Sequence, residues 1–180
     1  MQEPPVPVPM GDFEFYSGWV PTHEADSMFA RCLSDVPWAT KKWSLFYTLP
    51  QLAYYYGDDE RKKTPIPVLE EIIGVIEQAF DTRASVMWCN LYEDGNHHME
   101  WHQDQYGEQC FVLSLGASRP LDWRVKKSKV VLQTNTLGHG DLYYFNQTWD
   151  KEHEHRVPKV DGIDKRLSFV LFTQPPFSGR

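Results

Sequence analysis

The sequence predicts a mostly β protein with helices near its N-terminus, built on a jelly-roll-like double-stranded β-helix core. Two observations predict this class. From Ala84 onward the chain breaks into short strand-like runs separated by Gly, Asn and Asp turns. Apolar residues at helical spacing occur only before that point. Helices at the front followed by many strands favour two packed sheets.

The first part of the chain predicts one strand and one helix within a single domain over residues 13–180. Residues 1–12 contain four prolines and are expected to form a disordered or extended lead. Residues 12–20 then alternate as a strand does, and Thr22 is a candidate N-cap for a helix that runs to about Leu33. Its core-facing residues would be Ala25, Met28, Phe29 and Leu33.

The next segment predicts an aromatic strand pair, a turn and a second helix. Residues 43–67 are rich in aromatics, are interrupted at Pro50 and end in a polar stretch expected to be a flexible turn. Residues 67–80 begin with proline and carry apolar residues at helical spacing, which predicts an amphipathic helix covering one sheet. Its apolar residues are Val68, Ile72, Ile73, Ile76 and Phe80.

The region from about residue 84 to 175 is the predicted β-helix core. It holds eight short runs with strand character, bounded by turn residues. These are residues 85–93, 99–104, 110–116, 121–125, 129–135, 141–146, 154–158 and 166–172.

Length, charge and cysteine content narrow the class of protein. A chain of 180 residues suits one domain with a sizeable core. There is no apolar run of about 20 residues and no signal-peptide layout at the N-terminus, so we expect an intracellular protein, nuclear or cytoplasmic. The three cysteines lie in apolar segments and are expected to be reduced. The net charge of −7 is unusual for a nucleic-acid binder, although lysines and arginines cluster locally, as in residues 124–129.

A metal site is indicated by a His-x-Asp triplet. His102 and Asp104 stand two apart, so on a strand both side chains leave the same face. His155 supplies a third ligand, and two imidazoles with one carboxylate form the facial triad typical of non-haem Fe(II) oxygenases. His153 is an alternative third ligand. Zinc held by His98 and His102, four residues apart, is the rival metal site.

The blocks around this triplet resemble the AlkB-like Fe(II)/2-oxoglutarate-dependent dioxygenases, from about Pro50 to Gln174. The matching blocks are SVMWCNLYEDGNHHMEWHQD, CFVLSLGASRPLDWRVKK, LGHGDLYYFN, HEHRVPK and RLSFVLF. The resemblance implies Fe(II), 2-oxoglutarate and O2, with His102, Asp104 and His155 as catalytic metal ligands. It also implies that Asn90, Tyr92, Arg166 and Ser168 bind 2-oxoglutarate, Arg166 through its distal carboxylate.

The same resemblance marks candidate substrate residues and three departures. Residues 40–65 resemble the family's nucleotide-recognition lid, although Gln51 replaces its usual arginine. Phe172 replaces a second cosubstrate arginine, and Tyr106 replaces an acidic residue that faces the alkylated base. The candidate substrate-binding residues are Tyr54, Tyr55, Tyr56, Tyr106, Arg119 and Arg124.

The function implied is oxidative demethylation of N-alkylated bases in DNA or RNA, with release of formaldehyde, succinate and CO2. The expected partner is single-stranded nucleic acid, or a duplex whose base is flipped out, with no membrane and no second subunit. The acidic net charge and Tyr106 keep open a 2-oxoglutarate-dependent hydroxylase of a protein side chain or small molecule. A metal-free binding module is the third alternative.

Overall fold

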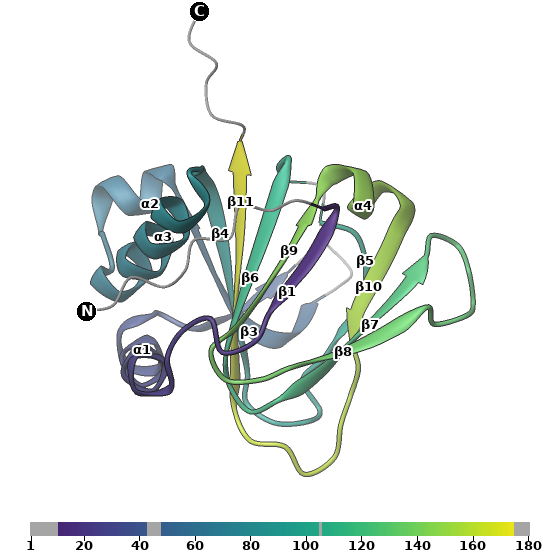
Figure 1. Cartoon of the computed structure of the whole chain (residues 1–180). Helices are drawn as coiled ribbons and strands as arrows, with labels where there is room; N and C mark the ends of the chain where they lie inside the picture. The colour runs from purple at the N-terminus through teal and green to yellow at the C-terminus, as the bar shows by residue number, and fades with distance from the viewer. Residues whose placement is uncertain (1–10, 43–47, 105, 175–180) are drawn as a thin grey trace, which may run out of the picture.

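The computed structural model describes residues 11–42, 48–104 and 106–174, which form two antiparallel sheets facing one another (Figure 1). The larger sheet contains, in spatial order, β1 (Phe13–Tyr16), β9 (Asp141–Asn146), β6 (Gln109–Gly116), β11 (Arg166–Gln174), β4 (Arg83–Tyr92), β3 (Thr48–Gly57) and β2 (Ala39–Lys42). The smaller contains β5 (Met99–His102), β10 (His153–Val157), β7 (Arg119–Val125) and β8 (Gln133–Leu137). The predicted jelly-roll-like class is confirmed.

Two helices cover the outer face of the larger sheet. They are α1 (Thr22–Asp35) and α3 (Pro67–Phe80), which lie together on that face in Figure 1. Pro67 opens α3 as predicted, and Ile72, Ile73 and Ile76 are buried against the sheet. The capping prediction for α1 is wrong, because the N-cap is Pro21 and Thr22 is already helical.

Strand periodicity decides which side chains face the helices and which face the smaller sheet. In β11, Leu167, Phe169 and Leu171 belong to the core beneath the helices. The alternate residues of this strand, Arg166, Ser168, Val170 and Phe172, line a pocket between the sheets. β4 pairs with β11 in register and divides its side chains in the same way, with Trp88, Asn90 and Tyr92 on the pocket side.

Two short helices contradict the prediction that helices occur only at the front and that residues 57–65 form a flexible turn. α2 (Asp58–Lys63) has three acidic residues in its first turn and three basic residues in its last, so its charges complement the helix dipole. α4 (Gln147–Glu152) begins where Asn146 accepts a hydrogen bond from the Trp149 N–H. Both signals are visible in the sequence, but neither segment has the apolar periodicity used to identify helices.

All eight predicted runs after Ala84 contain a strand; the run at 141–146 matches β9 at both ends, and the other seven have shifted ends. The run at 129–135 becomes a strand only from Gln133, and Asp104 lies two residues beyond the end of β5. Residues 1–10 of the predicted lead and residues 43–47 of the predicted lid lie outside the described residues. All three cysteines are buried and free, as predicted. Among the described residues, no helix is long and apolar enough to cross a membrane.

Candidate active site

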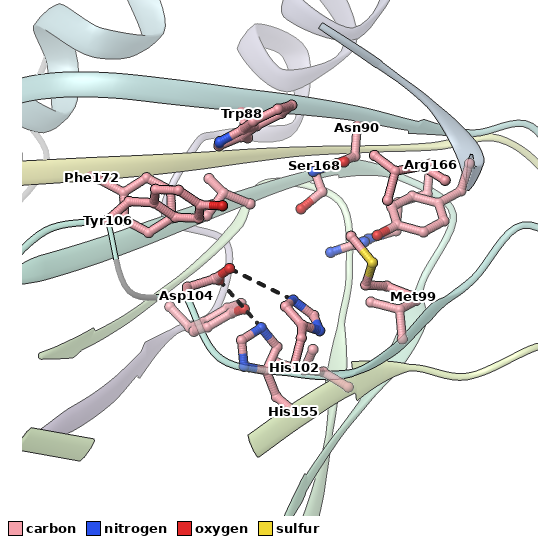
Figure 2. Close-up of a pocket in the computed structure, with 16 residues that line it drawn as sticks. Trp88, Asn90, Met99, His102, Asp104, Tyr106, His155, Arg166, Ser168 and Phe172 are labelled. Atoms are coloured by element: carbon pink, nitrogen blue, oxygen red, sulfur yellow. Dashed lines mark ion pairs between the residues drawn. The ribbon is translucent and has the colours of Figure 1, made fainter. Parts of the chain in front are cut away.

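The structure brings His102, Asp104 and His155 together at the end of β5. β10 pairs antiparallel with β5, so that His155 lies opposite His102. The Nε2 atoms of His102 and His155 are 3.7 and 3.4 Å from the two carboxylate oxygens of Asp104 (Figure 2). One ligand atom from each residue lies within 4.8 Å of the others. Among the described residues this is the one cluster of His, Cys, Asp and Glu with the spacing of a metal site.

The electrostatics of the cluster suit a divalent metal. Burial, together with the nearby His155, lowers the pKa of His102 to about 4, so its imidazole is neutral at pH 7. The Nδ1 atom of His102 is 2.7 Å from the Glu100 carbonyl, which can only accept, so Nδ1 carries the proton and Nε2 keeps its lone pair. Burial opposes the ionisation of Asp104, but the hydrogen bond from His155 and the electrostatic attraction of His155 and His102 together keep the Asp104 pKa below its ordinary value.

The segment that carries Asp104 is held by α4. The Asp104 N–H donates to Asp150 Oδ1 at 3.0 Å, and Asp150 is buried. Gln103 donates to the carbonyls of Asp150 and His153. Sequence reasoning missed these contacts, because Asp150 lies 46 residues after Asp104 in a polar stretch without a recognisable motif.

The alternative ligands are turned elsewhere. His153 stacks on Trp149 with ring centroids 3.9 Å apart, and its Nδ1 is 2.9 Å from the Trp149 carbonyl. His98 pairs with Glu100 at 3.2 Å and is not part of the cluster. The geometry therefore favours His155 over His153 as the third ligand and does not support the His98–His102 zinc site.

Arg166 carries a buried positive charge in the pocket that contains the cluster. It is 1% exposed, its Nε donates to Ser114 Oγ at 2.9 Å, and its guanidinium carbon lies 5.3 Å from the centre of the Tyr92 ring. Its Nη1 atom is buried and has no hydrogen-bond partner among the described residues. Burial lowers the pKa of Arg166, although nearby Tyr92 and Tyr143 oppose that shift. A buried cation of this kind requires an anion, so the site fits a ligand with a carboxylate.

The other predicted cosubstrate residues lie on the same wall. The register of β4 and β11 pairs Tyr92 with Arg166 and Asn90 with Ser168, and all four line the pocket (Figure 2). Gln51, at the position of the lid arginine, is fully buried and donates to Asn90 Oδ1 at 3.2 Å. This bond leaves the Asn90 amide nitrogen as a donor to a ligand. Gln51 is therefore buried beside Asn90 and does not lie on an exposed lid.

The opposite end of the pocket is aromatic. Trp88, Tyr106 and Phe172 line it, and the Tyr106 and Phe172 rings lie 5.3 Å apart. Phe172 therefore presents a ring where the resemblance led us to expect an arginine. Tyr55 is 39% exposed and packs edge-on against Trp88 at 5.0 Å, so it borders this end.

The substrate predictions for Tyr54, Tyr56 and Arg119 are wrong. Tyr54 and Tyr56 face the helix-covered core, because alternate residues of β3 point to opposite faces of the sheet. Arg119 is fully buried and donates to the carbonyls of Asp94, His97 and Pro158, so it ties loops together.

Arg124 stays a prediction, with a position now defined. It pairs with Glu154 at 2.8 Å and stacks over Trp101 at 4.2 Å. Its strand neighbour Trp123 contacts His155, so Arg124 points to the outer face of the smaller sheet.

Tyr56→Phe is expected to destabilise the fold by about 1–3 kcal/mol. The Tyr56 hydroxyl donates to Glu70 at 2.6 Å and accepts from the buried Ile66 N–H at 2.9 Å, which would lose its partner. Chemical denaturation measures the change. Tyr54→Phe, on the same face of β3, is the matched control and should cost less than about 0.5 kcal/mol. Equal losses in the two variants would contradict this role for the Tyr56 hydroxyl.

Comparison with known proteins agrees with the geometry. No family model matches the chain. The alpha-ketoglutarate-dependent dioxygenase alkB homolog 3 of Rattus norvegicus is 28% identical over 187 residues, covering 89% of this chain and 63% of that protein. The Homo sapiens protein of that name is 27% identical over 169 residues, covering 80% and 59%. The chain therefore spans roughly three fifths of the length of these relatives.

Solved structures share the fold at low sequence identity. OsALKBH1 superposes with a TM-score of 0.63 at 12% identity, covering 92% of this chain and 100% of that one. A prolyl hydroxylase of Trichoplax adhaerens, bound to a peptide fragment of hypoxia inducible factor, gives 0.65 at 8% identity, covering 91% and 84%. The chain is therefore similar in sequence to the alpha-ketoglutarate-dependent dioxygenases named alkB homolog 3 and shares its fold with OsALKBH1, and its His-Asp-His cluster has the spacing of a metal site.

Proposed function

We propose that this chain catalyses 2-oxoglutarate-dependent oxidative dealkylation of N-alkylated bases in DNA or RNA. The observation that carries the proposal is the buried guanidinium of Arg166, whose Nη1 has no hydrogen-bond partner among the described residues and which lies in the same pocket as a His-Asp-His cluster. A set of metal-binding side chains alone suits many reactions. Such a set beside an anion site suits a keto acid, which could bind the metal with one end and the arginine with the other.

The residues have separate tasks in this proposal. His102, Asp104 and His155 would hold Fe(II) through two imidazoles and one carboxylate. Bound Fe(II) supplies the activation of dioxygen, with conversion of 2-oxoglutarate to succinate and CO2. Arg166 holds the distal carboxylate of the keto acid, while Asn90 and Ser168 donate hydrogen bonds along the same wall. Trp88, Tyr106 and Phe172 exclude water and contact the flat face of a base.

The chemistry on the base balances without a further reagent. One oxygen atom of dioxygen enters the N-methyl group and the other ends in succinate. The N-hydroxymethyl base then releases formaldehyde and recovers its N–H. The target atom is hidden in a duplex, so the base must come from a single strand or be flipped out.

Two surface features support a nucleic-acid substrate. Tyr55 is an exposed ring beside the pocket, available to stack on a base. The loop between β7 and β8 carries the exposed Lys126, Lys127 and Lys129, which can contact phosphates although the whole chain is acidic. The alkB homolog 3 relatives are named alpha-ketoglutarate-dependent dioxygenases, which agrees with the proposed cosubstrate.

The test measures succinate and formaldehyde from Fe(II)-reconstituted protein. The substrates are methylated single-stranded DNA, methylated RNA and the same oligomers without methylation. We expect formaldehyde from the methylated oligomers alone, with succinate in equal amount. If succinate forms without formaldehyde and without stimulation by any oligomer, the nucleic-acid substrate is wrong and the hydroxylase alternative is favoured. If succinate does not form at all, the proposed activity is wrong.

A further inference from the structure

Tyr106 is the polar residue at the aromatic end of the pocket. It is 46% exposed, and its ring packs on the buried ring of Phe172 with an interplanar angle of 58°. Figure 2 shows the Tyr106 hydroxyl directed into the pocket, on the side of the Asp104 carboxylate. Packing against Phe172 limits the movement of the ring, so the hydroxyl keeps its direction into the pocket.

Among the described residues that line the pocket, no carboxylate other than Asp104 is present to neutralise a cationic substrate. The Nε2 atoms of His102 and His155 lie against the two oxygens of Asp104. The remaining polar lining consists of neutral side chains and the cation Arg166. A positively charged base would enter without a carboxylate partner, which is unfavourable in a buried site.

Stacking does not decide between substrates here, because every base has a flat face that an aromatic ring can contact. Discrimination therefore falls to hydrogen bonding. A tyrosine hydroxyl is protonated at neutral pH and donates well, whereas a carboxylate only accepts.

The alkylated bases differ in their charge and in the hydrogen-bonding group beside the alkylated nitrogen. Methylation of N1 of guanine or N3 of thymine leaves a neutral base with a carbonyl next to the methylated nitrogen. Methylation of N1 of adenine gives a cation with an amino group in that place and no carbonyl. Methylation of N3 of cytosine also gives a cation, with an amino group on one side of the methylated nitrogen and a carbonyl on the other. A hydroxyl donor at the pocket mouth matches the carbonyl of the first group.

We propose that Tyr106 is a specificity-determining residue that directs this site towards neutral N-alkylated bases with a carbonyl beside the alkylated nitrogen. The proposal rests on the proposed function and names its substrate class. The Tyr106 hydroxyl donates to the carbonyl of the base, while Phe172 holds the tyrosine ring in position.

The experiment compares two single-stranded DNA oligomers that differ in one base, N1-methylguanine or N1-methyladenine. Binding is measured by fluorescence anisotropy with metal- and 2-oxoglutarate-loaded protein in the absence of oxygen, and turnover by formaldehyde release in air. We expect the wild type to prefer N1-methylguanine in both measurements. Tyr106→Phe, which keeps the ring on Phe172, should reduce that preference by about 3- to 10-fold, the value of one neutral hydrogen bond.

Tyr106→Glu supplies the second variant. It places a carboxylate at the same position and should move the preference towards N1-methyladenine. Equal binding of the two oligomers by the wild type, or an equal effect of Tyr106→Phe on both, would overturn the proposal, because a packing role alone affects both alike. If the binding preference is present but neither oligomer yields formaldehyde, the proposed dealkylation fails while the role of Tyr106 in selection stands.

Discussion

His155→Ala is expected to abolish metal binding and turnover together. The His155 imidazole is the buried member of the cluster, with its Nε2 atom 3.4 Å from the Asp104 carboxylate and its ring centroid 4.2 Å from that of His102. Loss of a residue that only supports a metal ligand costs about 10- to 100-fold in affinity or activity, so loss of a ligand should exceed about 100-fold. Mn(II) binding by calorimetry and succinate release with Fe(II) measure the two effects.

His153→Ala is the matched control on the same strand. Both histidines are buried and lie two residues apart, so both variants lose a similar side chain from β10. His153 stacks on Trp149 and its Nδ1 lies beside the Trp149 carbonyl, so its loss should lower the melting temperature and leave metal binding intact. Loss of metal in His153→Ala with retention in His155→Ala would mean that the wrong histidine has been assigned.

Strand periodicity accounts for most of what the sequence could predict about the site. Because side chains alternate, Arg166 at the head of β11 places Ser168 and Phe172 on its own face, and the structure has all three in the pocket. The same rule places His102 on one side of β5 and Trp101 on the other. A ligand pair two residues apart is therefore visible in the sequence before the partner strand is known.

Periodicity could not say which face of β3 is the functional one. It predicts that Tyr54 and Tyr56 lie on one face of β3 and Tyr55 on the other. The packing of α3 on the larger sheet determines which of these two faces is covered. Tyr56 lies under α3 because its hydroxyl donates a hydrogen bond to Glu70 and accepts one from the N–H of Ile66. These partners lie 10 and 14 residues away and carry no local signal that connects them with a tyrosine.

The burial of Arg119 and Arg166 could not be predicted from the sequence either. Arg119 and Arg166 both head strands, at the start of β7 and of β11, and both are fully buried. Nη1 and Nη2 of Arg119 donate to three backbone carbonyls, whereas Nη1 of Arg166 has no partner among the described residues. Backbone carbonyls have no side-chain identity, so a sequence gives no indication that a loop will supply them.

That contrast gives the two arginines opposite expected effects on stability. Arg119→Met should destabilise the protein by about 2–4 kcal/mol, because three backbone carbonyls lose a charged donor. Arg166→Met should leave the stability of the ligand-free protein unchanged or raise it by up to about 2 kcal/mol, because it removes an uncompensated buried charge. Denaturant titration of the two variants and the wild type measures the direction and size of each change in the free energy of unfolding.

The gain in stability at Arg166 should come at the expense of the cosubstrate. A bidentate pair of charged hydrogen bonds contributes roughly 2–4 kcal/mol, so the dissociation constant for 2-oxoglutarate should rise about 30- to 1,000-fold in Arg166→Met. In metal-loaded, oxygen-free wild type, 2-oxoglutarate should raise the melting temperature as any ligand of the folded state does. The variant should show no such rise at the same concentration. Arg166→Lys keeps the charge without the planar fork, so it should fall between the two. If Arg166→Met is destabilised as strongly as Arg119→Met and still binds 2-oxoglutarate with wild-type affinity, the guanidinium is structural and the anion site lies elsewhere.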